Sequence, residues 1–147
     1  MKVMKLAVIM VVAASLAGCG IAYQKKRDEL LSKSKPADWG VLDKDDVSKE
    51  ARKLAQMALV KAMLKDPDSA KFGFQEPTRG TDIVNGEAVL VWYASMYVNA
   101  KNSFGGYVGD RRYAFQYKCI PNSKEQCKMI NIGVPDSKYP DQLDWQL

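Results

Sequence analysis

The stretch Thr81–Asn99, TDIVNGEAVLVWYASMYVN, decides the fold of this 147-residue chain. Asn85-Gly86 is the dipeptide most typical of a tight turn between two antiparallel strands. After the turn, side chains alternate between two faces: Ala88, Leu90, Trp92, Ala94, Met96 and Val98 on one, and Val89, Val91, Tyr93, Ser95, Tyr97 and Asn99 on the other. A period of two is typical of a β-strand, so the sequence predicts a hairpin with a long strand over Glu87–Asn99.

Further period-two segments lie on both sides of this hairpin. Phe72 and Phe74 lie two residues apart before it, and Tyr107–Cys119 predicts a second long strand after it. One face of that second strand is formed by Tyr113, Phe115 and Tyr117. Lys128–Ile132 predicts a final short strand, so we expect a sheet of three to four antiparallel strands.

Val47–Lys65 has the periodicity of an amphipathic helix. Its apolar positions share one face: Val47, Ala51, Leu54, Ala55, Ala58, Leu59, Ala62 and Met63. Asp43, Asp45 and Asp46 supply acidic groups and a capping oxygen at its start, and Asp66-Pro67 ends it. The predicted fold is therefore α+β, with the apolar face of one helix laid on the sheet and one disulfide.

The chain contains three cysteines and no histidine. The absence of histidine excludes hydrolysis with a histidine base and His-ligated zinc. Cys119 and Cys127 form an even pair apart from Cys19, and we predict a disulfide between them. A redox pair or a metal site is the alternative, but the spacing lacks the C-x-x-C geometry. We expect neither a metal nor a cofactor.

The N-terminus has the organisation of an export signal. Lys2 and Lys5 precede the apolar run Leu6–Ala14. The next residues, Leu16-Ala17-Gly18-Cys19, resemble the lipobox of bacterial lipoproteins. This resemblance implies cleavage before Cys19 and acylation of that residue, including palmitate, which anchors the chain in the lipid bilayer.

The same resemblance implies the location of the protein. Gly20 follows the modified cysteine, where an aspartate would favour retention in the inner membrane, so the sorting rule of lipoproteins implies the outer membrane. The alternative is an ordinary secretory signal.

Removing Lys2 and Lys5 with the signal lowers the net charge from +5 to +3. No basic run interleaved with aromatics remains, and we expect no nucleic-acid partner.

These patterns divide the chain into four parts. We predict a lipoprotein signal peptide over 1–18, a lipidated N-terminus and tether over 19–46, an α+β domain over 47–134, and an extended C-terminal tail over 135–147. Within the tether, Tyr23–Lys33 has a helical pattern, and Trp39 can dock onto the domain.

Two motifs resemble those of a group of small exported bacterial proteins and lipoproteins. They are LKDPDSAKF at 64–72 and VNAKNSFGGYVG at 98–109. The resemblance implies an envelope setting and carries over no catalytic residue. That group often has a cysteine just before the Val-Asn pair, where this chain has Met96 and Tyr97.

The second motif contains the candidate binding loop: Asn99, Lys101, Asn102, Ser103, Phe104, Gly105, Gly106 and Tyr107. Its glycines free backbone amides, and its polar and aromatic side chains suit a polar ligand, an anion or the backbone of a partner. The alternative is that Asn and Gly only make a tight connection between strands.

The function that these patterns favour is a membrane-anchored lipoprotein of the bacterial cell envelope with a non-enzymatic binding domain. Its partner would be an envelope protein or a cell-wall component. The alternatives are an inhibitor of a cell-wall enzyme and an accessory factor in outer-membrane assembly. A Ser/Lys hydrolase would have to use Ser69 with Lys71 or Ser103 with Lys101, and neither pair has the S-x-x-K spacing.

Overall fold

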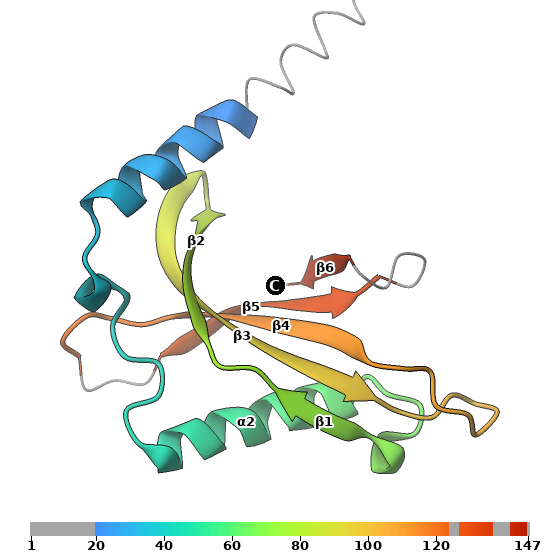
Figure 1. Ribbon diagram of the computed structural model, residues 1–147. Helices are drawn as coiled ribbons and strands as arrows, with labels where there is room; N and C mark the ends of the chain where they lie inside the picture. Colours follow the sequence, from blue (N-terminus) through green and yellow to red (C-terminus); the bar gives the residue numbers. More distant parts are fainter. Residues whose placement is uncertain (1–19, 124–126, 137–141, 147) are drawn as a thin grey trace, which may run out of the picture. The chain divides into compact units, whose positions relative to one another are not determined.

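A computed structural model describes residues 20–123, 127–136 and 142–146. Over these residues the chain is α+β, with two helices and a six-stranded antiparallel sheet (Figure 1). The predicted fold class is confirmed, and the sheet has more strands than the three to four expected. The described residues form two compact units. The first holds the chain up to Lys35 with Thr81–Leu90, and the second holds Pro36–Gly80 with the chain from Val91 onward.

The sheet has the strand order β1-β3-β4-β5-β6, and β2 pairs with β3. The strands are β1 (Lys71–Phe74), β2 (Thr78–Val84), β3 (Glu87–Asn99), β4 (Arg111–Lys118), β5 (Lys128–Pro135) and β6 (Leu143–Gln146). β3 has the predicted bounds, because its alternating pattern is uninterrupted. At the turn before it, Asn85 and Gly86 have positive φ angles of 52° and 81°, as a two-residue type I′ hairpin requires.

The helix α2 (Asp46–Lys61) begins and ends at residues whose chemistry explains its bounds. The carboxylate of Asp45 accepts from the Ser48 amide at 2.7 Å, and the Ser48 hydroxyl accepts from the Asp45 amide at 3.0 Å. This capping box satisfies amides that the first turn leaves without partners. α2 ends before the predicted Lys65, and Asp66 caps the short 3-10 helix η2 (Pro67–Ser69).

The first unit consists of a helix over 20–33 and the turn end of the β2–β3 hairpin. Arg27 bonds the carboxylate of Asp82 at 3.0 Å, and Lys26 bonds that of Glu87 at 3.2 Å. The segment predicted as a tether is therefore helical over 20–33, and ion pairs join it to the hairpin. No helix of the described part of the chain is long and apolar enough to cross a membrane.

The second unit begins at the 3-10 helix η1 (Pro36–Trp39), and Trp39 is buried. Its indole nitrogen donates to the carbonyl of Gly80 at 2.8 Å, and its own carbonyl accepts from the indole of Trp92 at 3.1 Å. The prediction that Trp39 docks is confirmed. A hydrogen bond thus holds both the buried indole and the backbone carbonyl of Trp39.

One hydrophobic core lies in the second unit, between α2 and the sheet (Figure 1). Its buried members are Val60, Ala94, Met96, Val98, Tyr113, Phe115 and Tyr117. The predicted apolar faces of the two long strands therefore point inward, as the alternation indicates. On the opposite face of the sheet, Trp145 of β6 packs edge-on against Tyr93 with ring centroids 6.3 Å apart.

The predicted orientation of the helix is wrong. All eight residues of the predicted apolar face are exposed, and Val47 and Leu54 reach 78% and 63%. The face that packs on the sheet instead contains Arg52, Gln56 and Val60. Val60 lies in the core and Met57 packs half-buried beside it. α2 therefore packs on the sheet through a mixed polar and apolar face and exposes the face that has the most apolar residues.

Polar partners explain why this face can be buried. Arg52 makes two hydrogen bonds to the carboxylate of Asp43, at 2.8 and 2.7 Å, and a third to the amide oxygen of Gln56 at 3.2 Å. Gln56 in turn donates to the hydroxyl of Tyr117 at 3.0 Å. Every link satisfies a group that would otherwise be costly to bury. Two lysines of α2 cover aromatic rings of β1, Lys53 over Phe74 and Lys61 over Phe72.

The predicted disulfide Cys119–Cys127 is confirmed, with Cα atoms 4.2 Å apart. Gly40 passes directly beside it with a positive φ of 65°. A Cβ at Gly40 would lie 2.8 Å from the Cβ of Cys119, so both the angle and the space require glycine there. The sulfur of Cys127 also contacts the carbonyl oxygen of Val41 at 3.2 Å.

Candidate functional site

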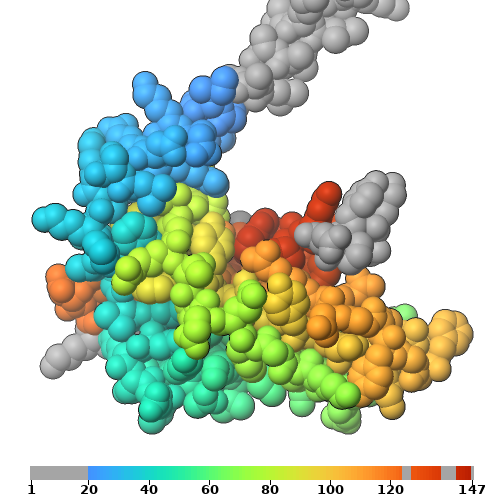
Figure 2. Space-filling view, in the orientation of Figure 1, coloured from blue at the N-terminus to red at the C-terminus, as the bar shows by residue number. Residues whose placement is uncertain are grey.

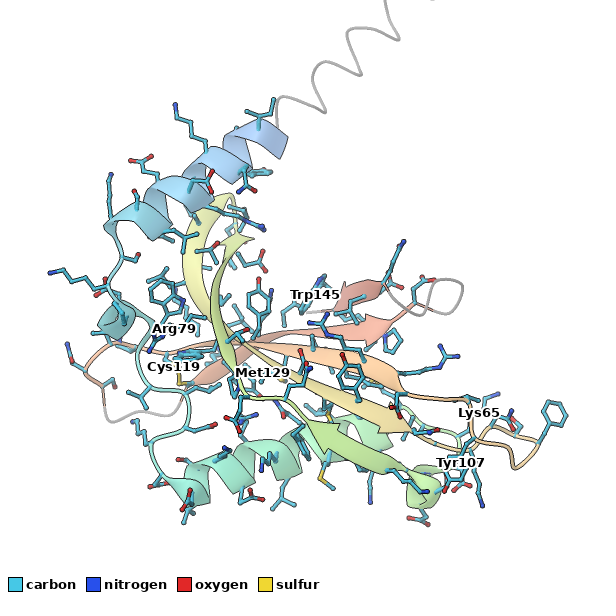
Figure 3. The ribbon with its side chains drawn as sticks, in the orientation of Figure 1. Lys65, Arg79, Tyr107, Cys119, Met129 and Trp145 are labelled. Carbon is cyan, nitrogen blue, oxygen red and sulfur yellow. A yellow bond between two sulfur atoms is a disulfide. The ribbon has the colours of Figure 1, made fainter. Side chains whose placement is uncertain are left out.

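The two sequence motifs meet at one end of the sheet. The hydroxyl of Ser69 accepts from the amide of Lys101 at 2.9 Å, and the Tyr107 hydroxyl donates to the carbonyl of Ser69 at 3.4 Å. Figure 3 shows Lys65 of the first motif close to Tyr107 of the second. We call this assembly of residues 65–71 and 99–109 the tip. Motifs that are well separated in the sequence thus form one structural feature.

Asn102 fixes the shape of the candidate binding loop. Its side-chain oxygen accepts from the amides of Phe104 at 2.9 Å and Gly106 at 3.2 Å, and its own amide donates to the carbonyl of Gly106 at 2.8 Å. Gly105 has a φ of 80°, a conformation that favours glycine. Asn102 and Gly105 therefore serve the connection itself, as the structural alternative expects, and leave the neighbouring side chains for other roles.

Phe104 is the most exposed large apolar side chain of the tip, at 97%. The loop that carries it is closed by an isolated bridge between Lys101 and Tyr107 and by the bonds to Asn102. An aromatic side chain is thus held in solvent on an ordered turn. Asn99 has the opposite environment, since its amide oxygen is buried without a hydrogen-bond partner among the described residues.

Three lysines surround the aromatic base of the tip. The ammonium groups of Lys71 and Lys101 lie 4.8 and 5.6 Å from the centre of the Tyr107 ring, and that of Lys65 donates to the Ser103 hydroxyl at 3.2 Å. Cations over a ring face are attracted by its electrons and remain partly hydrated. The tip therefore presents positive charge around an exposed phenyl ring.

The structure joins the serines of the tip to groups other than their predicted lysine partners. Ser69 donates to the carbonyl of Asp66 at 2.9 Å and accepts from the Lys101 backbone, while Ser103 bonds Lys65. The ammonium groups of Lys71 and Lys101 lie over Tyr107 instead. Within the described ranges, no group of three or more Cys, Asp or Glu side chains could hold a metal ion.

A second surface, which the sequence reasoning missed, is the exposed side of α2. A groove of about 250 Å³ runs along it, lined by Leu42, Lys44, Ser48, Ala51, Arg52, Ala55, Leu59, Tyr117, Cys127 and Met129. Burial raises the pKa of Tyr117, the residue on this groove that also bonds Gln56. The signal that could have indicated it is the spacing of Arg52, Gln56 and Val60. These residues recur every four positions and so share one face of the helix, which is the face that the structure buries.

The predicted lipidation site, Cys19, and the signal peptide 1–18 lie outside the described residues. The secondary structure of the second unit begins at η1, Pro36–Trp39, ahead of residue 47, where the α+β domain is predicted to start. Comparisons with family models, with curated proteins and with solved structures found no match.

Proposed function

We propose that this protein is a lipid-anchored binding domain of the bacterial cell envelope, without catalytic activity, which engages its partner through the tip. The observation that carries the proposal is Phe104, an almost fully exposed ring on a turn closed by hydrogen bonds. A loop that is already closed by hydrogen bonds has little backbone entropy left to lose on binding. Aromatic anchors of this kind dominate the energy of many interfaces.

The charges of the tip support a partner with anionic groups beside an apolar patch. Lys65, Lys71 and Lys101 lie around Tyr107 and Ser103, and each can donate to a phosphate or a carboxylate. Asp66 is already engaged as the cap of η2. An envelope protein with an acidic rim around an apolar pocket would satisfy both features.

Membrane anchoring is the second part of the proposal. The lipobox at Leu16-Ala17-Gly18-Cys19 supports two or more acyl chains on Cys19, and two suffice for stable anchoring. Anchoring confines the domain to a layer near the membrane and raises its effective concentration toward envelope partners. Gly20 supports the outer membrane as the location.

Photo-cross-linking from the tip tests the proposal. A benzophenone amino acid replaces Phe104 in the full chain, expressed with its own signal sequence in an enteric-type bacterium. We expect one adduct of defined mass that weakens in a Lys71→Glu/Lys101→Glu background and persists in Ser103→Ala. The matched control carries the same probe at Lys128, which is exposed on β5. Equal adducts from both positions, or none from position 104, would refute binding through the tip.

A further inference from the structure

The exposed side of α2 carries an apolar surface that no other segment of the described part of the chain covers. Its members on α2 are Val47, Ala51, Leu54, Ala55, Ala58 and Leu59, and the exposed Ala62 and Met63 continue it just past the end of the helix. Single exposed apolar side chains are ordinary, but a contiguous stripe over the whole length of a helix marks an interaction surface. In Figure 2 the teal surface of α2 lies at the lower left of the view.

We propose that this face binds the same face of a second copy of the chain, with the two α2 helices antiparallel about a two-fold axis. Such an axis near Leu54 and Ala55 places Ala51 against Ala58 of the second copy, and Val47 against Ala62. A bulky residue thus meets a small one at the ends and, as Leu54 against Ala55, at the axis. Two alanines, Ala51 and Ala58, meet between these contacts. Alanines at the contact let two helix axes approach closely.

Charge complementarity selects a second copy as the occupant. Glu50 and Lys61 border the same side of the apolar stripe, one near each end of α2. Within one chain Glu50 pairs with Lys53 at 2.8 Å and the Lys61 ammonium lies over the Phe72 ring, so a contact between copies adds a second partner to each. An antiparallel partner brings Lys61 of the second copy beside Glu50, and the reverse contact forms by symmetry. The helix dipoles also oppose one another in this arrangement. A parallel pair about a two-fold axis would instead leave Glu50 and Lys61 on opposite flanks of the interface.

The groove beside the stripe adds apolar area to the same interface. Ala51, Ala55 and Leu59 belong both to the exposed face of α2 and to the lining of the groove. Met129 of β5 forms the opposite wall and is itself exposed. A helix laid against α2 would therefore also cover this wall. The inference is independent of the tip, because none of these residues belongs to it.

Cysteine cross-linking in native envelopes tests the pairing and its register. In the full chain, Ala55→Cys places a thiol next to the two-fold axis, so mild oxidation should yield a dimer on a non-reducing gel. Val47→Cys lies about 22 Å from its own symmetry mate by helix rise, beyond disulfide reach. It should cross-link only when co-expressed with Ala62→Cys. Lys128→Cys is the control on β5.

Charge variants keep the test independent of any single thiol. In the Ala55→Cys background, Ala58→Lys should lower the dimer yield more than about tenfold, since it would bury an unpaired charge. Glu50→Lys should lower it about two- to five-fold, and Glu50→Lys/Lys61→Glu should restore it. The proposal is overturned by equal dimer at all single positions, by a monomer alone, or by a disulfide to a chain of different mass.

Discussion

Arg52 is the residue on which the orientation of α2 depends. Its side chain is 7% exposed and makes two hydrogen bonds to Asp43, with a third to Gln56. Removing one partner of a buried ion pair leaves the other charge without compensation. Arg52 therefore ties α2 to Asp43 and holds Gln56, whose amide donates to the hydroxyl of Tyr117 on β4.

We expect Arg52→Met to lower the free energy of unfolding by about 2–4 kcal/mol, because the carboxylate of Asp43 loses its buried partner. Urea denaturation of the full chain measures the change. Lys128→Met, at an exposed position, should stay within about 0.5 kcal/mol of the parent protein. Equal effects of the two substitutions would mean that α2 packs through its apolar side instead.

Tyr117 should make the stability fall at alkaline pH. Burial raises its pKa above the ordinary 10.0, so the folded chain keeps a proton that the unfolded chain has lost. The stabilisation is fully present below pH 10 and is lost as the pH rises through the folded pKa. Tyr117→Phe should cost about 1 kcal/mol at neutral pH, because Gln56 loses its acceptor.

The difference between Tyr117→Phe and the parent protein should then shrink between neutral pH and about pH 11. Urea denaturation across this range measures it, and the titration of the lysines cancels in the comparison. A difference that stays constant with pH would contradict a raised pKa for Tyr117.

At the scale of elements, the sequence predicts those whose signals are local. Asn85-Gly86 and uninterrupted alternation predicted β3 with its observed bounds, whereas α2 ends at Lys61, before the end that Asp66-Pro67 predicted. The orientation of α2 could not be predicted in the same way. Periodicity counts apolar residues, but it does not show that Gln56 will find a hydroxyl on β4, 61 residues along the chain.

The candidate site was predictable to a similar extent. Glycine and asparagine indicated the loop, and the disulfide followed from the even cysteine pair. The role of Asn102 as a fixing residue, and the contact of Ser69 with Lys101, depend on packing that spacing does not encode. The two motifs predicted which residues belong to the tip, but they did not predict how those residues contact one another.

The connection from β4 to β5 should depend on its disulfide. Closing the loop between Cys119 and Cys127 should stabilise the fold by about 2–3 kcal/mol on the loop-entropy model. We therefore expect Cys119→Ser/Cys127→Ser to lower the free energy of unfolding by this amount in urea. Addition of a reductant should destabilise the parent protein equally and leave the variant unchanged. If the reductant also lowered the free energy of unfolding of the variant, its effect on the parent protein could not be assigned to this disulfide.

At the scale of the whole chain, different parts of the protein suit different roles. We propose that Cys19 holds the protein in the membrane, the tip engages a partner, and the exposed side of α2 joins two copies. Two copies on one membrane would present two tips. Once one tip has bound, the second binds at a high effective concentration, so the overall affinity exceeds that of a single tip. The ion pairs and hydrogen bonds between the helix over 20–33 and the hairpin order the segment between anchor and domain.

Hydroxyl-radical footprinting of Phe104 tests the central claim, which is binding through the tip, most directly. The full chain is oxidised once as purified protein and once in intact envelopes, and the modification of each side chain is read by mass spectrometry. Trp145, half exposed on β6, serves as the internal reference. The account predicts strong modification of Phe104 in the purified protein and protection in envelopes relative to Trp145. Equal modification in both states would contradict it.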